Sequence, residues 1–145
     1  RNPKDVAYKY MELSALLSTA DIFTLHLPLN EATKGLINKD FLTKMKSTAL
    51  IINTSRGAII DEVALVTALE NQTIEGYATD VLSIEPPESD HPLLKLPNVL
   101  ITPHSASLTA STYNFMCVST VTNALKILEG LAVEERFVFN LQDIG

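Results

Sequence analysis

Apolar residues along the chain fall into two kinds of segment that alternate. Short continuous apolar runs, which are typical of strands, occupy residues 22–27, 48–53, 75–82 and 99–102. Between and around them, apolar residues recur at helical spacing over residues 11–17, 38–45, 61–71 and 109–131. Strands that alternate with helices predict right-handed crossovers and a doubly wound parallel sheet, which is an α/β fold.

Polar residues, prolines and glycines mark the predicted ends of these elements. Asn38 and Asp61 are suited to cap the helices that follow them, and Gly130 is suited to end the long helix. Pro28 and Pro103 each stop a strand, because proline has no N–H for the ladder. No internal repeat, low-complexity segment or linker interrupts this pattern.

Four further expectations follow from the local pattern. The run 48–53 is continuously apolar, which predicts a strand buried on both faces, as in a parallel sheet. The helix over 61–71 is expected to turn Val63, Leu65, Val66 and Leu69 inward. Residues 83–97 form a proline-rich segment that predicts an irregular loop. The last residues, 132–145, form a tail with a strand-like run at 137–139.

Composition and charge exclude several classes of function. The 145 residues are enough for one domain with its own core. A net charge of −6 and the lack of a basic stripe argue against nucleic-acid binding, and no run approaches membrane-spanning length. The single cysteine, Cys117, suggests a reducing, cytoplasmic compartment and is expected to fill the core. The chain begins with Arg rather than Met, so we expect a piece of a longer protein.

Arg56, Glu85 and His104 each come just past the end of an apolar run. If those runs are neighbouring parallel strands, the three side chains converge on the carboxyl edge of the sheet, where open α/β sheets bind ligands. A guanidinium can hold a carboxylate through two hydrogen bonds, and a histidine backed by a glutamate can give and take a proton. The trio predicts an enzyme that acts on a small carboxylic acid.

Each of these positions also has a structural interpretation. Arg56 can pair with a helix carboxylate such as Glu62, and Glu85 can be a surface acid in a turn. A lone histidine at a strand end is more often structural than catalytic. For His104 the catalytic interpretation is favoured, because an arginine and an acid follow the other two strands in equivalent positions. Asp80 can either accept a hydrogen bond from a ligand amide or cap a turn. His91 lies in a polar loop, where we expect it to be solvated.

The glycines leave the extent of the fold open. A dinucleotide-binding sheet usually opens with a glycine-rich turn between strand and helix. The five glycines here, at positions 35, 57, 76, 130 and 145, are not clustered. Taken alone, the sequence fits either half of a Rossmann domain or a complete small α/β domain of another kind.

Over roughly residues 20–107, the sequence resembles the D-isomer-specific 2-hydroxyacid dehydrogenases. No one of the matching motifs is specific, but their order and spacing together are. The matching segments are the strand 20–29, the loop 30–37, Asn53-Thr54-Ser55-Arg56-Gly57, Asp80-Val81 through Glu85-Pro86, and Thr102-Pro103-His104-Ser105-Ala106. The loop 85–94 is slightly more similar to glycerate/hydroxypyruvate members than to others.

The resemblance implies a role for each member of the trio. Arg56 would bind the substrate carboxylate and polarise its carbonyl. His104 would be the general acid–base, oriented by Glu85, and Asp80 would hold the nicotinamide carboxamide. The residues that would bind the cofactor are Leu27, Pro28, Thr33, Thr54, Ser55, Arg56, Asp80, His104 and Ala106.

The resemblance also implies a domain plan. Residues 1–131 would be the second part of a dinucleotide-binding domain, and residues 132–145 a tail that leads back toward a substrate domain. The glycine-rich phosphate loop would precede Arg1, so this segment alone is expected to be inactive. NAD would be the cofactor, or NADP if Arg1 favours a 2′-phosphate. The full-length protein would be a homodimer that interconverts a D-2-hydroxy acid and a 2-oxo acid.

Two other functions fit the same residues. The first is a non-catalytic regulator that binds NAD(H) as a sensor, since such a protein can retain the whole trio. The second is an α/β domain that binds no nucleotide and resembles the family by chance.

Overall fold

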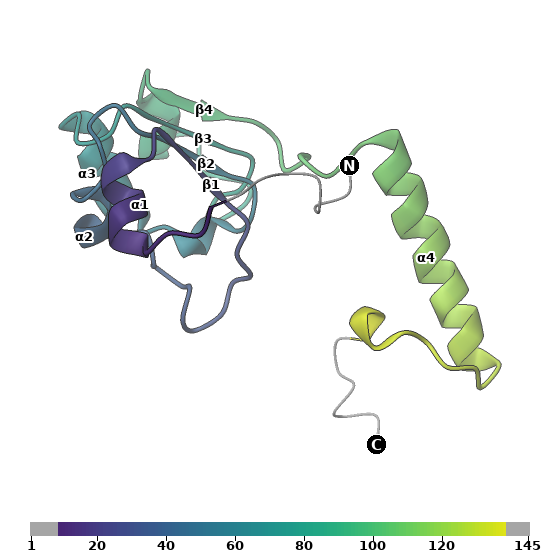
Figure 1. The fold of residues 1–145 in the computed structure, drawn as a ribbon. Coiled ribbons are helices and arrows are strands. Elements are labelled where there is room, and N and C mark those ends of the chain that lie inside the picture. Colours follow the sequence, from purple (N-terminus) through teal and green to yellow (C-terminus); the bar gives the residue numbers. More distant parts are fainter. Residues whose placement is uncertain (1–8, 139–145) are drawn as a thin grey trace. The chain divides into compact units, whose positions relative to one another are not determined.

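The computed structural model describes residues 9–138, apart from the side chain at position 136. The chain divides into two compact units, with the break between His104 and Ser105. In the first unit, helices and strands alternate along the chain (Figure 1). Its elements are α1 (Leu13–Thr19), β1 (Ile22–Leu25), α2 (Lys39–Leu42), β2 (Leu50–Asn53), η2 (Gly57–Ile59), α3 (Glu62–Glu70), β3 (Gly76–Thr79), η3 (Pro92–Lys95) and β4 (Val99–Ile101).

The four strands form one parallel sheet in the order β1-β2-β3-β4. Each strand is shorter than the apolar run that predicted it, but the parallel α/β architecture is confirmed. The register aligns Leu25 with Asn53, Asn53 with Thr79, and Thr79 with Ile101. The four strands therefore end side by side, and the loops that follow them leave from one edge.

One face of the sheet holds the core. Phe23, Ile51 and Tyr77 occupy the same row of the register and are buried. They belong to one apolar cluster with Leu17 of α1 and Leu42 of α2. From α3, Leu65 and Leu69 join the same cluster. Burial of these apolar side chains is the main source of stability for the unit.

The expected burial of β2 on both faces is wrong. Ile51 is 1% exposed, whereas its neighbour Leu50 is 39% exposed. Ile22 and Leu100, which point to the same side as Leu50 by the alternation of a strand, are 59% and 64% exposed. Among the described residues, the helices that contribute to the core cluster pack on the opposite face, so this side of the sheet keeps an apolar surface.

The helix starts follow the predicted caps. Asn38 accepts a hydrogen bond from the N–H of Phe41, and Asp61 accepts from the N–H groups of Val63 and Ala64. Each bond satisfies a backbone donor that the first helical turn leaves without a partner. The inward positions expected for Leu65, Val66 and Leu69 are confirmed, since Leu65 and Leu69 are buried and Val66 packs partly buried against the core. Ala68 is buried as well, which was not expected.

Val63 is 79% exposed, so its predicted inward position is wrong. It lies two residues before Leu65, which on a helix with 3.6 residues per turn places the two side chains on different faces.

The proline-rich segment is also more regular than expected. Its second half forms the short helix η3, which buries Leu93 in the core.

The second unit contains the long helix α4 (Ala110–Leu128) and the short helix η4 (Glu135–Phe137). Thr109 caps α4, and Gly130 follows its end with a φ of +70°, a conformation that favours glycine. No residue of α4 is buried, so the expected core position of Cys117 is wrong. No helix in the described residues is both long and apolar enough to cross a bilayer.

The strand expected at residues 137–139 is not formed at Phe137 and Val138, and position 139 lies outside the described residues. Instead, the N–H of Phe137 donates to the carbonyl of Glu134, and that of Val138 donates to Glu135. A short strand needs a neighbour to pair with its backbone groups, and a local 3₁₀ turn satisfies them without one.

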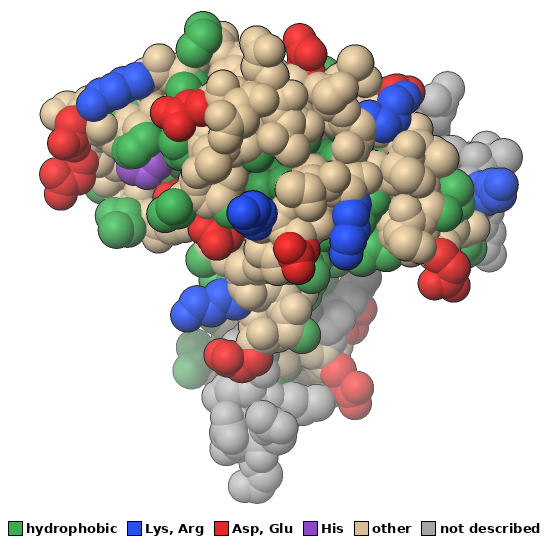
Figure 2. Space-filling view, turned by 90° about the vertical axis from the view of Figure 1, so that its left-hand side faces the viewer, with side chains coloured by type: hydrophobic (Ala, Val, Ile, Leu, Met, Phe, Trp, Pro, Cys, Tyr) green, Lys and Arg blue, Asp and Glu red, His purple; other side chains and the backbone are tan. Residues whose placement is uncertain are grey.

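Acidic and basic side chains are interspersed on the side of the first unit where α2 and α3 lie (Figure 2). The described residues on this face show no basic stripe, in keeping with the net charge of −6.

The orientation of α3 gives a stability prediction. Leu65→Ala should lower the free energy of unfolding by about 2–5 kcal/mol, because truncating a fully buried leucine leaves a cavity. Val63→Ala, on the exposed side of the same helix, should change it by less than about 0.5 kcal/mol. Urea unfolding of both variants beside the parent measures the difference. Equal losses in the two variants would contradict this orientation.

Candidate active site

The turn after β2 is built by two buried polar residues. Asn53 is 0% exposed, accepts from the N–H of Ser55 at 3.0 Å and donates to the carbonyl of Arg56 at 3.0 Å. The hydroxyl of Ser55 donates to the carbonyl of Leu25 at 2.6 Å, which ties the end of β2 to the end of β1. These bonds fix the backbone from which the Arg56 side chain extends.

The Arg56 side chain is exposed, and its guanidinium donates to the carbonyl of Ser55 at 2.7 Å. Glu62, its suggested structural partner, instead accepts from the N–H of Ser83 at 2.9 Å. No ion pair of Arg56 with an acid is present in the part of the chain that the structure describes. The guanidinium is therefore accessible to a ligand at the carboxyl edge.

Gly57 brings this turn into contact with the loop after β3. A Cβ atom at position 57 would lie 2.0 Å from the carbonyl carbon of Leu82 and 2.3 Å from the nitrogen of Ser83. Only glycine leaves room for this backbone at its present position. The arginine turn and the segment that leads to Glu85 are therefore packed directly against each other.

The end of β3 is held to β2 in a similar way. The Thr79 hydroxyl donates to the carbonyl of Asn53 at 2.7 Å. Asp80 follows directly and is 6% exposed, so a carboxylate lies buried at the carboxyl edge between the strand and the loop. The choice between a ligand acceptor and a turn cap at Asp80 stays open at this point.

Glu85 and His104 meet across the ends of β3 and β4. The Nδ1 atom of His104 lies 2.9 Å from Oε2 of Glu85, and Oε1 of Glu85 accepts from the N–H of Leu82 at 2.9 Å. The imidazole and the carboxylate are both partly exposed, at 50% and 36%. Because Glu85 holds Nδ1, the opposite nitrogen of the ring is left to face a ligand.

The hydrogen bond from His104 holds the pKa of Glu85 below its usual 4.5, and the Leu82 N–H lowers that pKa further. The carboxylate therefore stays ionised through neutral and mildly acidic pH. It remains an acceptor for the ring throughout that range.

A cavity of about 390 Å³ adjoins this pair. Its lining includes the buried Asp80 together with Glu85 and His104. Arg56 is not among the residues that line it. The structure thus brings three of the predicted site residues around one cavity and places Arg56 on the neighbouring turn of the same edge.

The loop after β1 carries three of the predicted cofactor residues. Leu27 is 39% exposed, and the Thr33 hydroxyl donates to the carbonyl of Pro28 at 2.6 Å. Thr33 therefore shapes its own loop through its side chain. Thr54 is exposed in the turn after β2. Ala106 belongs to the second unit.

His91 is not solvated, contrary to the expectation from its polar loop. Its side chain is 19% exposed, and its Nε2 atom lies 3.4 Å from Oε2 of Glu62. Neither this contact nor the bond between Glu62 and Ser83 was expected, since Glu62 lies on α3, far in the sequence from the loop that carries Ser83 and His91. The sequence offered one indication of such contacts: the proline-rich loop 83–97 is long, and a long irregular loop needs contacts with a neighbouring element to hold its position.

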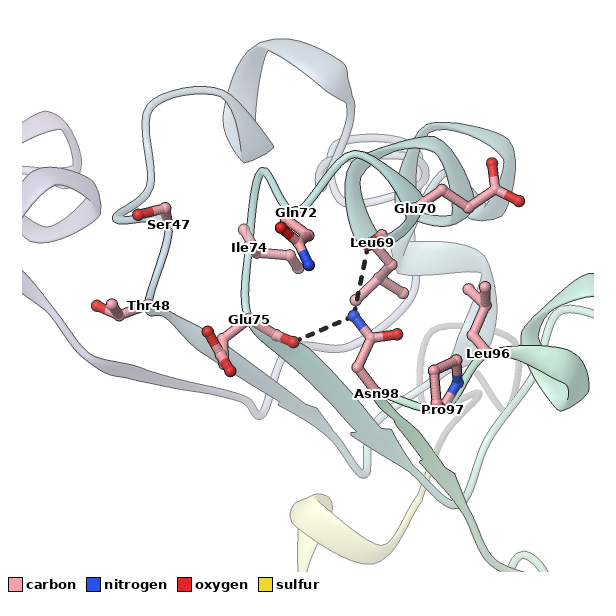
Figure 3. A pocket seen from close by; sticks show the side chains of 10 residues that line it. All are labelled: Ser47, Thr48, Leu69, Glu70, Gln72, Ile74, Glu75, Leu96, Pro97 and Asn98. Carbon is pink, nitrogen blue, oxygen red and sulfur yellow. Dashed lines mark hydrogen bonds between the residues drawn. The ribbon is translucent and has the colours of Figure 1, made fainter.

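A larger cavity, of about 610 Å³, lies at the opposite edge of the sheet (Figure 3). Thr48, Glu75 and Asn98, which precede β2, β3 and β4, are among its lining residues. The Asn98 amide donates across it to the carbonyls of Leu69 and Glu75. None of the predicted site residues lines this cavity, and ligands of parallel sheets bind at the carboxyl edge instead.

The pair at the carboxyl edge gives a prediction about ionisation. His104→Ala should raise the pKa of Glu85 toward 4.5, because its main hydrogen bond is lost, but the Leu82 N–H should keep it below that value. A ¹³C NMR titration of the Glu85 carboxyl measures it. His26→Ala, which removes a ring that contacts Thr24 instead, should leave this pKa unchanged. An unchanged pKa in both variants would contradict the contact.

Comparison with known proteins identifies the family. The sequence model of the D-isomer specific 2-hydroxyacid dehydrogenase NAD-binding domain matches residues 1–106. The chain is 42% identical over 122 residues to glyoxylate reductase of Thermofilum pendens, covering 84% of this chain and 36% of the relative. It is 43% identical over 122 residues to glyoxylate/hydroxypyruvate reductase B of Klebsiella pneumoniae, covering 84% of this chain and 38% of the relative. The chain thus spans less than two fifths of the length of these relatives.

Solved structures agree with the family assignment. A D-isomer specific 2-hydroxyacid dehydrogenase from Lactobacillus delbrueckii, in its NAD-complexed form, superposes with a TM-score of 0.79 at 34% identity, covering 90% of this chain and 46% of that one. A family member from Xanthobacter autotrophicus, in complex with NADPH and MES, gives a TM-score of 0.72 at 35% identity, covering 83% of this chain and 49% of that one. The resemblance carried by the sequence motifs is confirmed, and a chance likeness is excluded. The chain belongs to the D-isomer specific 2-hydroxyacid dehydrogenases, within their NAD-binding domain.

Proposed function

We propose that the whole protein transfers a hydride between a nicotinamide cofactor and a D-2-hydroxy acid/2-oxo acid pair. The observation that carries this proposal is the hydrogen-bonded Glu85–His104 pair, which adjoins a cavity at the carboxyl edge of a family NAD-binding domain. Relatives named glyoxylate reductase and glyoxylate/hydroxypyruvate reductase support a small 2-oxo acid as the substrate. We favour a substrate of the glyoxylate or hydroxypyruvate size.

The residues of the trio have distinct tasks in this reaction. In the direction of reduction, His104 gives a proton to the carbonyl oxygen of the substrate, and Glu85 keeps the ring in the required orientation. Arg56 holds the substrate carboxylate through two hydrogen bonds. Arg56 and His104 together stabilise the negative charge that forms on the oxygen. In the direction of oxidation, His104 takes the proton from the hydroxyl.

The donor set at the carboxyl edge fits the nicotinamide end of the cofactor. The nicotinamide supplies or accepts the hydride when it is bound. Asp80 is a buried acceptor suited to the carboxamide N–H groups, and the loops that carry Leu27, Pro28, Thr33, Thr54 and Ser55 leave the same edge. Arg56, His104 and Ala106 complete the proposed cofactor set. NAD is the cofactor we favour, and NADP is an alternative that the NADPH-bound relative supports.

The domain plan, oligomeric state and compartment are further proposals. Residues 1–131 would form the second part of the dinucleotide-binding domain, and residues 132–145 the tail. A homodimer is supported by the apolar side chains that α4 exposes, such as Phe115, Val118 and Leu125, because a helix with apolar residues on several sides is normally buried. A cytoplasmic location is supported by the single free cysteine.

A turnover assay tests the proposal as a whole. The whole protein should oxidise NADH or NADPH in the presence of at least one member of a panel of small 2-oxo acids, and absorbance at 340 nm follows the reaction. Cofactor binding without turnover on any panel member would instead favour the NAD(H)-sensing regulator.

His104→Gln in the whole protein should lower kcat by about 10²–10⁴-fold, because the proton donor is lost. The dissociation constant of NADH should change little, since glutamine keeps a polar side chain of similar reach beside the cofactor and what is lost is proton transfer to the substrate oxygen. Steady-state kinetics and NADH fluorescence titration measure the two quantities. Near-native turnover in this variant would remove His104 from the acid–base role.

Arg56→Lys keeps the positive charge but loses the two-pronged geometry of the guanidinium. We expect KM for the 2-oxo acid to rise and kcat to fall. The cofactor dissociation constant should stay nearly constant, because Arg56 would meet the nicotinamide only through its backbone, and so should the melting temperature. Kinetics and a melting curve on this one variant measure all four. A lowered melting temperature with native KM and kcat would show that Arg56 is structural.

A further inference from the structure

The loop between β3 and β4 must hold Glu85 in place without regular secondary structure. From Val81 to His91 the chain forms only turns and bends. Glu85 is fixed within the loop through Leu82, whose N–H it accepts at 2.9 Å. The position of the Glu85 carboxylate therefore depends on whatever fixes the backbone at Leu82 and Ser83.

Glu62 is the side chain that fixes this backbone. One of its carboxylate oxygens accepts from the N–H of Ser83 at 2.9 Å, and the other lies 3.4 Å from Nε2 of His91. The two contacts lie on either side of Glu85 in the sequence. A single carboxylate thus contacts both ends of the segment that carries Glu85, through a hydrogen bond at Ser83 and a polar contact at His91.

The anchor itself is rigid. Glu62 is the first residue of α3, which Leu65 and Leu69 fasten to the core. The side chains of Glu62 and His91 are only 21% and 19% exposed, so water competes weakly for their contact. Among the described residues, the Nδ1 atom of His91 is buried without a hydrogen-bond partner, which leaves Nε2 as the ring nitrogen with a polar contact, to Glu62.

The same backbone also contacts the arginine turn. Ser83 lies between Glu62, which accepts its N–H, and Gly57, whose missing Cβ would come within 2.3 Å of its nitrogen. The contact with Glu62 therefore holds the loop against the residue that follows Arg56. The spacing between the Arg56 turn and Glu85 is set at this point.

We propose that Glu62 is a positioning residue for the reaction: it holds the 82–91 loop so that Glu85 meets His104. This inference rests on the proposed function. It assigns to Glu62 no contact with the substrate or the cofactor. Its effect reaches the substrate through the Ser83 backbone, Glu85 and the imidazole.

The proposal is tested with Glu62→Ala in the whole protein. The expected result is a fall in kcat of about 10–100-fold, because small displacements of a catalytic group have effects of that size. KM for the 2-oxo acid and the NADH dissociation constant should change less than about threefold. Glu62→Gln keeps an oxygen for the Ser83 N–H and should restore most of kcat.

The matched control is Glu70→Ala, at the other end of the same helix. It removes the same charge from α3, lies beside the cavity at the opposite edge, and should leave all kinetic constants unchanged. Native kcat in Glu62→Ala, or equal losses in Glu62→Ala and Glu70→Ala, would overturn the proposal. If Glu62→Ala does not fold, His91→Ala tests the second contact and should also lower kcat without raising KM.

A spectroscopic readout separates this proposal from the proposed function. Loss of the anchor should weaken the contact between Glu85 and His104, so the pKa of Glu85 should rise toward 4.5 in Glu62→Ala and stay low in Glu62→Gln. This NMR titration needs no turnover. The proposed function fails if the parent protein turns over no 2-oxo acid. The anchoring role of Glu62 is refuted separately, if the pKa of Glu85 is unchanged in Glu62→Ala.

Discussion

The buried amide of Asn53 is the interaction on which the carboxyl edge depends. It closes the turn that carries Arg56, and its own backbone carbonyl accepts the Thr79 hydroxyl from the next strand. With no exposed surface, this side chain cannot exchange its partners for water. Leaving a buried polar group unsatisfied costs about 1–3 kcal/mol, so the turn and both strand ends hold one geometry together. The Arg56 turn and the Asp80 position follow from that arrangement.

A second constraint connects the edge to the helical layer. Gly57 allows backbone to pack on backbone, and Glu62 then holds the β3–β4 loop from the side of α3. Leu65 and Leu69 of this helix belong to the core cluster, so the core is connected through α3 and Glu62 to the loop that carries Glu85. The backbone at Ser83 is therefore held both by the hydrogen bond to Glu62 and by the close packing against Gly57.

The sequence predicted the features that depend on interactions between residues close together in the chain. The strands, the caps at Asn38 and Asp61, and the glycine after α4 follow from short-range rules, and the contact between Glu85 and His104 follows from parallel strands ending together. The partners of Glu62 and His91 could not be predicted, because a loop contact over long sequence separation depends on the final packing. The exposure of Leu50 and Cys117 depends likewise on which surfaces of the molecule are covered, and an apolar residue type does not specify that. Val63 is a different case, because its spacing from Leu65 on the helix already places it on another face.

At the candidate site, the residues that build the turns and the residues proposed to react differ in depth. Asn53, Ser55, Thr79 and Asp80 are buried, whereas Arg56, Glu85 and His104 reach solvent. Replacing an exposed side chain usually changes stability little, while replacing a buried polar one is costly. In evolutionary terms, a lineage with this architecture can alter or lose its chemistry by a single surface substitution and still inherit an intact fold. Replacing a buried scaffold residue costs stability instead, so we expect descendants of such a protein to diverge in activity sooner than in shape.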